Sequence, residues 1–484
     1  MFLKAGALSL ALLLASRLLG LLRESAQAAA FGASGLADVV VLMLTLPDWL
    51  AGFLASGALA YVLVPAWAGQ DRASVAATQR RVALWVIVGG VLLALGLLVF
   101  RQSTALWLAG GLSTAQLPAA STALIWSAVA LPAALLASLW VTRLQHERDF
   151  TGMYGANLVV NVALIAAIVW TANSAAGNAV QFLGIGLVAA MLLRLAWLHW
   201  RTPALDVAPV TAVAPVLPSP PVWLWAALSA GLPLALPFVA RSIASREGEG
   251  ALATFNYAWK LVELPLILAI QLVATLAFPA IARAVAQRDD ALTATAVRTA
   301  FALAWTLACA AAAGLIVGAP AVASLLFGWG RMDAQALERI AHWGSLGAWG
   351  LLPQALIAVT LTVLAARASM SAAVAAYAGA VAMLLLAPAL GWSGGAQLMV
   401  VMNVLLSGVA LVCIAALGRD VARWVPWKAM AVSLACLLGA AAVSRLLSLT
   451  PSLVAGLASA LIAAVLVAVV TWLSSADLRA ALAR

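Results

Sequence analysis

Apolar runs of about 20 residues recur along almost the whole of this chain, and each is long enough to cross roughly 30 Å of hydrocarbon as a helix. The chain has 484 residues, of which 66% are hydrophobic and only 9% are charged. No soluble fold hides this much apolar surface from water. A membrane β-barrel would show alternating polarity instead of continuous runs. The sequence therefore predicts an all-α polytopic membrane protein.

Loop signals between the apolar runs divide the chain into about fourteen transmembrane spans. Most Lys and Arg residues outside the runs fall in alternate loops, on one side of the predicted membrane. By the positive-inside rule, this side is the cytoplasm. With an even number of spans, both termini are expected to be cytoplasmic. The cations on the opposite side are Arg101, Arg246, Arg331, Arg339 and Arg445.

Residues 202–222 form the most proline-rich stretch of the chain. Prolines this close together favour an extended linker over a helix. We therefore expect an N-terminal lobe of about six helices over 1–201 and a cytoplasmic linker over 202–222, with each helix needing about 20 residues. A second lobe of similar size is expected over 223–418, followed by a C-terminal helix pair over 419–484.

The two predicted lobes carry related segments. Leu46–Ala66 and Glu263–Ala280 each have Leu-Pro near the start and Pro-Ala near the end. Helices interrupted by Pro or Gly in matching positions of repeated halves are typical of transporter binding sites. The pattern favours a transporter with a weak internal repeat. The simpler alternative is that Pro and Gly are common in membrane helices.

Several cations lie inside runs that otherwise have the composition of membrane spans. A cation at the bilayer centre costs about 2.5–3.5 kcal/mol on translocon scales, so such residues are expected to face a polar cavity. A cationic cavity at membrane depth is suited to an anion. Two of the cations fall in the first apolar run, which also lacks a convincing cleavage site and is therefore expected to be a retained helix. The candidate binding residues are Arg17, Arg23, Arg241 and Lys260.

Three acids accompany these cations and are candidates for gating or ion pairing. Arg17 and Glu24 share one face of a helix, and Lys260 and Glu263 are close enough along a helix to pair. The alternative to an anion site is a set of internal salt bridges that neutralise these cations. For Arg241 the alternative is extension toward a membrane surface. The three acids are Glu24, Asp38 and Glu263.

The sequence gives no indication of a metal, nucleotide or catalytic site. It has no GxxxxGK[ST] phosphate loop. His146, His199 and His342 are far apart, and the cysteines lie in apolar runs without CxxC spacing. The net charge of +10 is scattered through short loops, unlike a nucleic-acid-binding surface. We therefore expect no cofactor, no metal, no nucleic-acid partner and no enzymatic activity.

Two segments resemble a known family. Ser16–Trp67 resembles the amino-terminal signature of the MviN/MurJ-type lipid II flippases, which belong to the multidrug/oligosaccharidyl-lipid/polysaccharide exporter superfamily. Tyr257–Pro265 resembles the family's Tyr-Ala-x-Arg-Leu-x-Glu-x-Pro element, and Arg241 fits the pattern just before it. The resemblance extends through nearly the whole chain.

The resemblance implies two helical lobes plus a final helix pair, and transport of a polyprenyl-diphosphate-linked peptidoglycan precursor to the periplasmic leaflet. It implies that Arg17, Arg23 and Lys260 meet the diphosphate, while Asp38 and Glu263 gate or orient these cations. The implied setting is the bacterial inner membrane, and the implied partners are the lipid substrate, membrane lipids and proteins of cell-wall synthesis.

The segment also departs from the family pattern. Ala51 stands where a cavity arginine is expected, and Asp48 adds an acid nearby. Lys260 replaces an arginine and loses its bidentate geometry. Three alternatives therefore stay open: a flippase for another polyprenyl-linked glycan, a MATE-like cation or drug antiporter, and a non-transporting membrane scaffold. The surplus of cations argues against the antiporter, because a cation site needs acids.

Overall fold

Every regular element in the described part of the chain is a helix, as the sequence predicts. Twelve of these helices are long and apolar enough to cross a membrane, and a pair bent by 45° (α13, Ala334–Ala348, and α14, Leu351–Ala366) would add a thirteenth. The 30 residues of α1, Phe2–Phe31, are also long enough to cross. The predicted number of about fourteen spans therefore agrees with the structure. This structure, a computed structural model, describes residues 2–173, 178–202, 217–447, 452–476 and 478–479.

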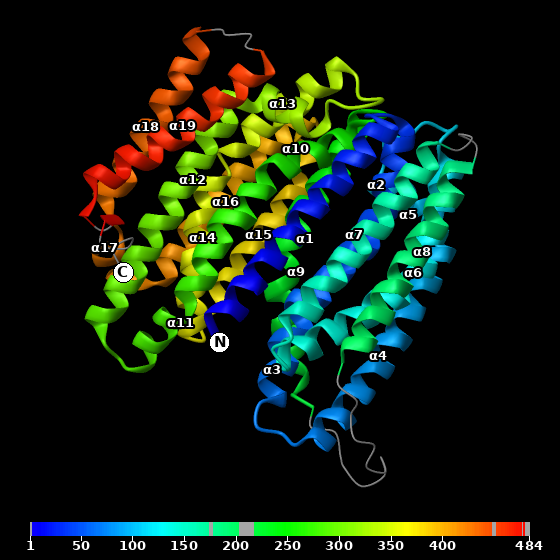
Figure 1. Cartoon of the computed structure of the whole chain (residues 1–484), viewed down its shortest axis with the longest axis horizontal. Coiled ribbons are helices and arrows are strands. Elements are labelled where there is room, and N and C mark those ends of the chain that lie inside the picture. The colour runs from blue at the N-terminus through cyan, green and yellow to red at the C-terminus, as the bar shows by residue number, and fades with distance from the viewer. Residues whose placement is uncertain (1, 174–177, 203–216, 448–451, 477, 480–484) are drawn as a thin grey trace. The chain divides into compact units, whose positions relative to one another are not determined.

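The helices group into two compact units (Figure 1). The first unit contains the residues up to Ala235 together with Ser245–Ala253, and the second contains Leu236–Ala244 and the residues from Thr254 onward. The helices of the first unit, besides α1, are α2 (Gly35–Phe53), α3 (Leu59–Trp67), α4 (Arg72–Val99), α5 (Arg101–Leu108), α6 (Leu117–His146), α7 (Phe150–Ala172) and α8 (Ala179–Arg201).

Two helices, α9 (Pro220–Ala244) and α10 (Ala251–Pro265), contribute residues to both units. The predicted linker over 202–222 lies mainly outside the described residues. Because α9 begins at Pro220, the last residues of that predicted linker are helical, and proline suits the first turn, where its missing N–H is not needed. The remaining helices, besides α13 and α14, are α11 (Leu272–Ala286), α12 (Asp290–Phe327), α15 (Ser371–Leu386), α16 (Gly395–Ala416), α17 (Val421–Trp424), α18 (Trp427–Leu447) and α19 (Leu453–Ser474).

Two long helices contain a π-helical segment after a Leu-Pro pair. In the first unit, α2 contains Pro47 and continues through η1 (Leu54–Ala58) into α3. In the second unit, α10 ends at Pro265 and continues through η4 (Leu266–Gln271) into α11. These are the two related segments found in the sequence. Because π-helical turns are rare and concentrate at functional sites, their matching positions support the internal repeat.

Three of the turns between helices have the same conformation. Arg148 (φ 59°), Arg288 (φ 54°) and Ala368 (φ 53°) are left-handed residues directly after α6, α11 and α14. In each turn the following N–H donates to a carbonyl five residues earlier, which is the Schellman arrangement that ends a helix. Aspartates cap α7 and α12, which follow two of these turns, and also α4 and α13, which assigns a structural role to several of the few acids. The capping residues are Asp71, Asp149, Asp289 and Asp333.

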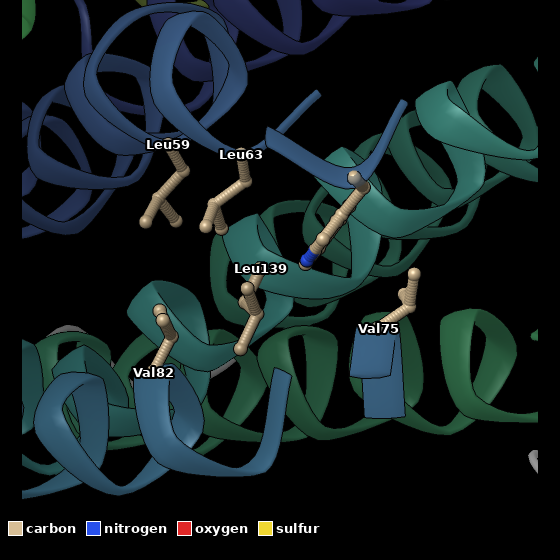
Figure 2. Close-up of a cluster of buried hydrophobic side chains, with 6 residues drawn as sticks. Leu59, Leu63, Val75, Val82 and Leu139 are labelled. Carbon is tan, nitrogen blue, oxygen red and sulfur yellow. The ribbon is translucent and has the colours of Figure 1, made fainter. Parts of the chain in front are cut away.

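An apolar cluster joins α3, α4 and α6 inside the first unit (Figure 2). Trp67, at the end of α3, is fully buried in it. Because lipid tails are as apolar as these side chains, close packing rather than escape from water stabilises the contact. The other members of the cluster are Leu59, Leu63, Val75, Val82 and Leu139.

Small residues bring α19 against α12 in the second unit. Gly314 and Gly318 are one turn apart on α12 and face Ala460 of α19. A Cβ built at Gly318 would lie only 2.4 Å from the Cβ of Ala460 and 3.1 Å from the carbonyl oxygen of Gly456. Figure 1 shows α18 beside α19 in the same bundle. Small residues one turn apart let two membrane helices approach closely.

We expect Gly318→Val to separate α12 from α19, because the added side chain overlaps Ala460. Overpacking of this kind costs about 1–3 kcal/mol, so the thermal unfolding temperature in detergent should fall by several degrees. Gly379→Val on α15 is the matched control, because a Cβ there meets nothing within 4 Å. Equal stability of the two variants would show that this contact is not close in solution.

Candidate functional site

Charged and amide side chains of the first unit gather on helices that pack against one another. Within this unit α1 packs against α7, and α7 packs against α8. Hydrogen bonds and electrostatic interactions connect residues on these helices and on α2. We call this set the arginine cluster. Its members are Arg17, Arg23, Glu24, Asp48, Asn157, Asn161 and Arg194.

Arg23 lies between two carboxylates. Its Nη1 donates to Oδ2 of Asp48 over 2.8 Å, and its Nη2 donates to Oε1 of Glu24 over 2.9 Å. The side chains of Arg23 and Glu24 are only 13% and 8% exposed. Glu24 therefore bonds Arg23 and not Arg17, although Arg17 shares its helix face, because the long Arg23 side chain reaches both acids.

Arg17 is exposed, and none of the described residues hydrogen-bonds or ion-pairs with it. Its charge acts on Tyr154 of α7. One turn further along α1, Gly20 faces the same helix, where a Cβ would lie 3.8 Å from Nδ2 of Asn161. The predicted binding residues Arg17 and Arg23 thus lie on one helix in different environments.

Arg194 is a buried cation that the sequence analysis did not single out. It lies within α8, is 8% exposed, and its Nη2 is 3.4 Å from Oδ1 of Asn157. The charge of Asp48 also acts on it. The sequence signal was present, because Arg194 interrupts an apolar run as Arg17 does. Its position seven residues before Arg201, at the end of α8, made it resemble an ordinary span end.

Ala51 is buried between helices. It is 2% exposed, and its carbonyl oxygen accepts a hydrogen bond from Oγ of Ser138 on α6 over 2.9 Å. The position at which the family pattern places a cavity arginine therefore packs against α6 here. A small side chain at this position is consistent with that contact.

The predicted cations of the second unit also have partners. Nζ of Lys260 bonds Oε2 of Glu263 over 2.6 Å, which confirms the predicted pair. Nη1 of Arg241 donates to Oδ1 of Asn256 over 2.7 Å, and its guanidinium lies 5.4 Å from the centre of the Phe238 ring. Because Asn256 is buried, Arg241 is directed into the protein and does not simply extend to a membrane surface.

Asp38 bonds backbone amides. Its Oδ2 accepts from the N–H of Gly250 over 2.7 Å and its Oδ1 from the N–H of Ala253 over 2.8 Å. The side chain is 1% exposed. Asp38 thus caps the first turn of α10, where a carboxylate is favoured by the unpaired N–H groups. The gating or orienting role implied for Asp38 stays a prediction.

The residues around this cap form a tightly fitted segment, Ser245–Ala253, which we call the capped segment. Oγ of Ser245 accepts from the N–H of Gly110 over 3.0 Å. Gly250 has φ +80°, and a Cβ there would lie 2.1 Å from the carbonyl oxygen of Ala33. Only glycine fits this conformation and this approach. The capped segment is therefore fixed to the first unit at several points.

Among the described residues, no group of three or more His, Cys, Asp or Glu side chains is arranged to hold a metal ion. The arrangement is instead one of cations whose present partners are carboxylates and amides. Such side chains can exchange these partners for the oxygens of an anionic ligand.

Comparison with known proteins shows what this chain is similar to. The profile of the family described as lipid II flippase MurJ matches residues 27–476. A solved structure of lipid II flippase MurJ in an inward closed conformation has a TM-score of 0.78 at 15% identity, covering 96% of this chain and 98% of that chain. A search of curated proteins gave no match.

Two further solved structures share the fold at lower similarity. An inward-facing multidrug resistance MATE family transporter of the MOP superfamily has a TM-score of 0.67 at 16% identity, covering 84% of this chain and 95% of that chain. A MOP superfamily transporter from Pyrococcus furiosus, described as having a binding pocket of reverse polarity, has a TM-score of 0.58 at 17% identity, with coverages of 86% and 96%.

Arg23→Gln is expected to destabilise the protein, because Glu24 and Asp48 would lose their common counter-charge. A lost charged hydrogen bond costs about 1.5–3 kcal/mol, so the thermal unfolding temperature should fall. Arg23→Gln combined with Asp48→Asn should recover part of this loss, because one of the two acids is then neutral. Losses that simply add in the double variant would show that the two residues are not coupled.

Asp38→Ala is expected to release the start of α10. Loss of a helix cap costs about 0.5–2 kcal/mol, so deuterium exchange at the amides of Gly250 and Ala253 should quicken. Glu249→Ala is the control, because Glu249 lies in the same segment and, among the described residues, accepts only a 3.3 Å bond from the N–H of Ser113. Unchanged exchange in the Asp38 variant would contradict the cap.

Proposed function

Because this chain belongs to the lipid II flippase MurJ family, we propose that it carries lipid II, the polyprenyl-diphosphate-linked peptidoglycan precursor, from the inner to the outer leaflet of the bacterial inner membrane. The observation that best supports the proposal is the family match over nearly the whole chain, combined with cations inside the membrane-spanning helices. The protein moves the lipid without a catalytic step, and proteins of cell-wall synthesis supply and consume it.

The proposal has a physical basis in the diphosphate head group. An unpaired ion cannot enter hydrocarbon without a large desolvation cost. Arginine and lysine side chains along the path lower that cost while the polyprenyl tail remains in lipid. A membrane potential that is negative inside favours outward movement of an anion by about 2.3 kcal/mol per charge per 100 mV.

Arg23 and Lys260 are the central binding residues of the proposal. Arg23 bonds Asp48 and Glu24, and Lys260 bonds Glu263. Carboxylate and phosphate oxygens are interchangeable partners for these cations. The acids therefore keep the cations neutralised when no lipid is bound, and substrate binding exchanges carboxylates for phosphate oxygens. Arg17, on the exposed face of α1, is the first cation to meet the head group, and Arg241 is a further contact.

Alternating access supplies the movement. The matched π-helical segments η1 and η4 lie within the long helices that begin with α2 and α10. Interrupted helices in matching halves are the usual moving and binding elements of such transporters. Asp38 serves as a gate through its cap on α10. The predicted four-part organisation and the cytoplasmic location of both termini complete this proposal.

The function can be tested by depletion and reconstitution. Arg17, Arg23 and Lys260 changed together to Ala should lower the flipping rate of labelled lipid II in liposomes by about tenfold or more, since each charged contact contributes a factor of this order. The same variant should fail to support growth of cells depleted of their own lipid II flippase. Arg101→Ala, in α5, controls for loss of a cation elsewhere.

Three results would contradict the assignment. Folded wild-type protein that does not flip lipid II but flips another polyprenyl-linked glycan would identify a different substrate. Proton- or sodium-dependent efflux of a cationic dye would favour an antiporter like the MATE relatives. Full transport by the triple variant would show that these cations are not the binding residues.

A further inference from the structure

Arg194 differs from the other deeply buried arginine of the first unit. Arg143 is 2% exposed, forms an ion pair with Glu147 on its own helix and lies 5.9 Å from the centre of the Trp67 ring. Arg194 is 8% exposed, and none of the described carboxylates forms an ion pair with it. Its single hydrogen bond within that part of the chain is the 3.4 Å contact with Asn157.

The Nε of Arg194 is without a hydrogen-bond partner among the described residues, as are Nε of Arg23 and Nε and Nη1 of Arg143, but those two arginines have ion pairs. A buried charged group with an unsatisfied donor is costly, and membrane depth makes it more so. A neutral, straight-chain apolar residue would pack at this position without that cost. A carboxylate partner for Arg194 would therefore be favourable.

Asp48 lies on α2 and Arg194 on α8, which pack against each other, and the charge of Asp48 acts on Arg194. In this structure Asp48 bonds Arg23, which also bonds Glu24. Arg23 therefore bonds both carboxylates of the arginine cluster, while Arg194 has only the longer hydrogen bond with Asn157 among the described residues. The cluster holds one acid, Asp48, that two arginines from different helices can share.

Substrate binding at Arg23 would leave the carboxylate of Asp48 without its partner. When phosphate oxygens take the place of Asp48 on Arg23, the displaced carboxylate lies beside a diphosphate and repels it. A second cation close to Asp48 removes that repulsion by pairing with it. Arg194 is close enough for its charge to interact with Asp48 and has an unused Nε donor.

We propose that Arg194 is a positioning residue for the lipid diphosphate: it takes over Asp48 when Arg23 binds the phosphate groups. This inference rests on the proposed function. The step is an exchange of ion-pair partners and forms no covalent bond. Arg194 acts through Asp48 and needs no direct contact with the substrate.

A double-mutant cycle on the full-length protein in nanodiscs tests this exchange, with undecaprenyl diphosphate as the probe and native mass spectrometry as the binding readout. Arg194→Gln should weaken binding by about tenfold, because Asp48 is left unneutralised beside the ligand. In an Asp48→Asn background the same change should alter the dissociation constant by less than about twofold, because there is no displaced charge to neutralise.

Two further variants complete the design. Arg143→Gln is the matched control, since it also removes a buried arginine of the first unit but should leave the dissociation constant unchanged. Arg194→Lys keeps the charge and should retain binding within about threefold, which provides a test if the glutamine variant does not fold.

The outcomes separate the two proposals. If the wild-type protein does not bind undecaprenyl diphosphate, the proposed function fails, and this inference fails with it. If the wild-type protein binds and Arg194→Gln is harmless, or is equally harmful with and without Asp48, the partner exchange is wrong while the proposed function stands. A change confined to the thermal unfolding temperature would assign Arg194 to helix packing and likewise overturn the exchange.

Discussion

The ion pair between Arg23 and its two carboxylates is the interaction on which the functional interpretation depends. An isolated charge is unfavourable within a helix bundle in hydrocarbon, and a buried pair is stable only when its geometry satisfies both ions. Arg23 meets that condition with Asp48 at 2.8 Å and Glu24 at 2.9 Å. The same pairing that makes the unliganded protein stable also leaves each partner replaceable by another anion.

The cations of the two units are paired with acids in different ways. In the second unit Lys260 and Glu263 are one turn apart on the same helix, so the pair forms wherever α10 forms. In the first unit Arg23 and Asp48 lie on different helices, so the pair depends on how α1 and α2 pack. A movement between α1 and α2 would therefore change the pairing of Arg23, while the pair of Lys260 and Glu263 lies within one helix. Under the proposed function, more of the specific recognition of phosphate falls on the arginines of the first unit, because a lysine loses bidentate geometry.

The sequence was most informative where the interaction is local. Apolar runs predicted the helices and their number, because a span must be long enough to cross hydrocarbon. The Leu-Pro pairs predicted related interrupted helices, and the spacing of Lys260 and Glu263 predicted their contact. The hydrogen bonds of Asp38 could not be predicted, because they reach backbone amides more than 200 residues away. The interactions of Arg194 could not be predicted, because they involve Asp48 and Asn157 on other helices. The periodicity within α8 does not reveal such interactions.

The π-helical segments and the cap of Asp38 also differ in whether their contacts are local or distant in the sequence. The bonds of η1 and η4 are local, because each π-helical turn hydrogen-bonds within its own helix. The cap of Asp38 on α10 is distant and rests on two hydrogen bonds and on Gly250, whose backbone fits against Ala33 only without a side chain. Breaking this cap leaves a buried carboxylate and a free helix start, both of which favour entry of water. Asp38 and Asp48 lie on the same helix, so the cap on α10 and the ion pair with Arg23 both depend on the position of α2.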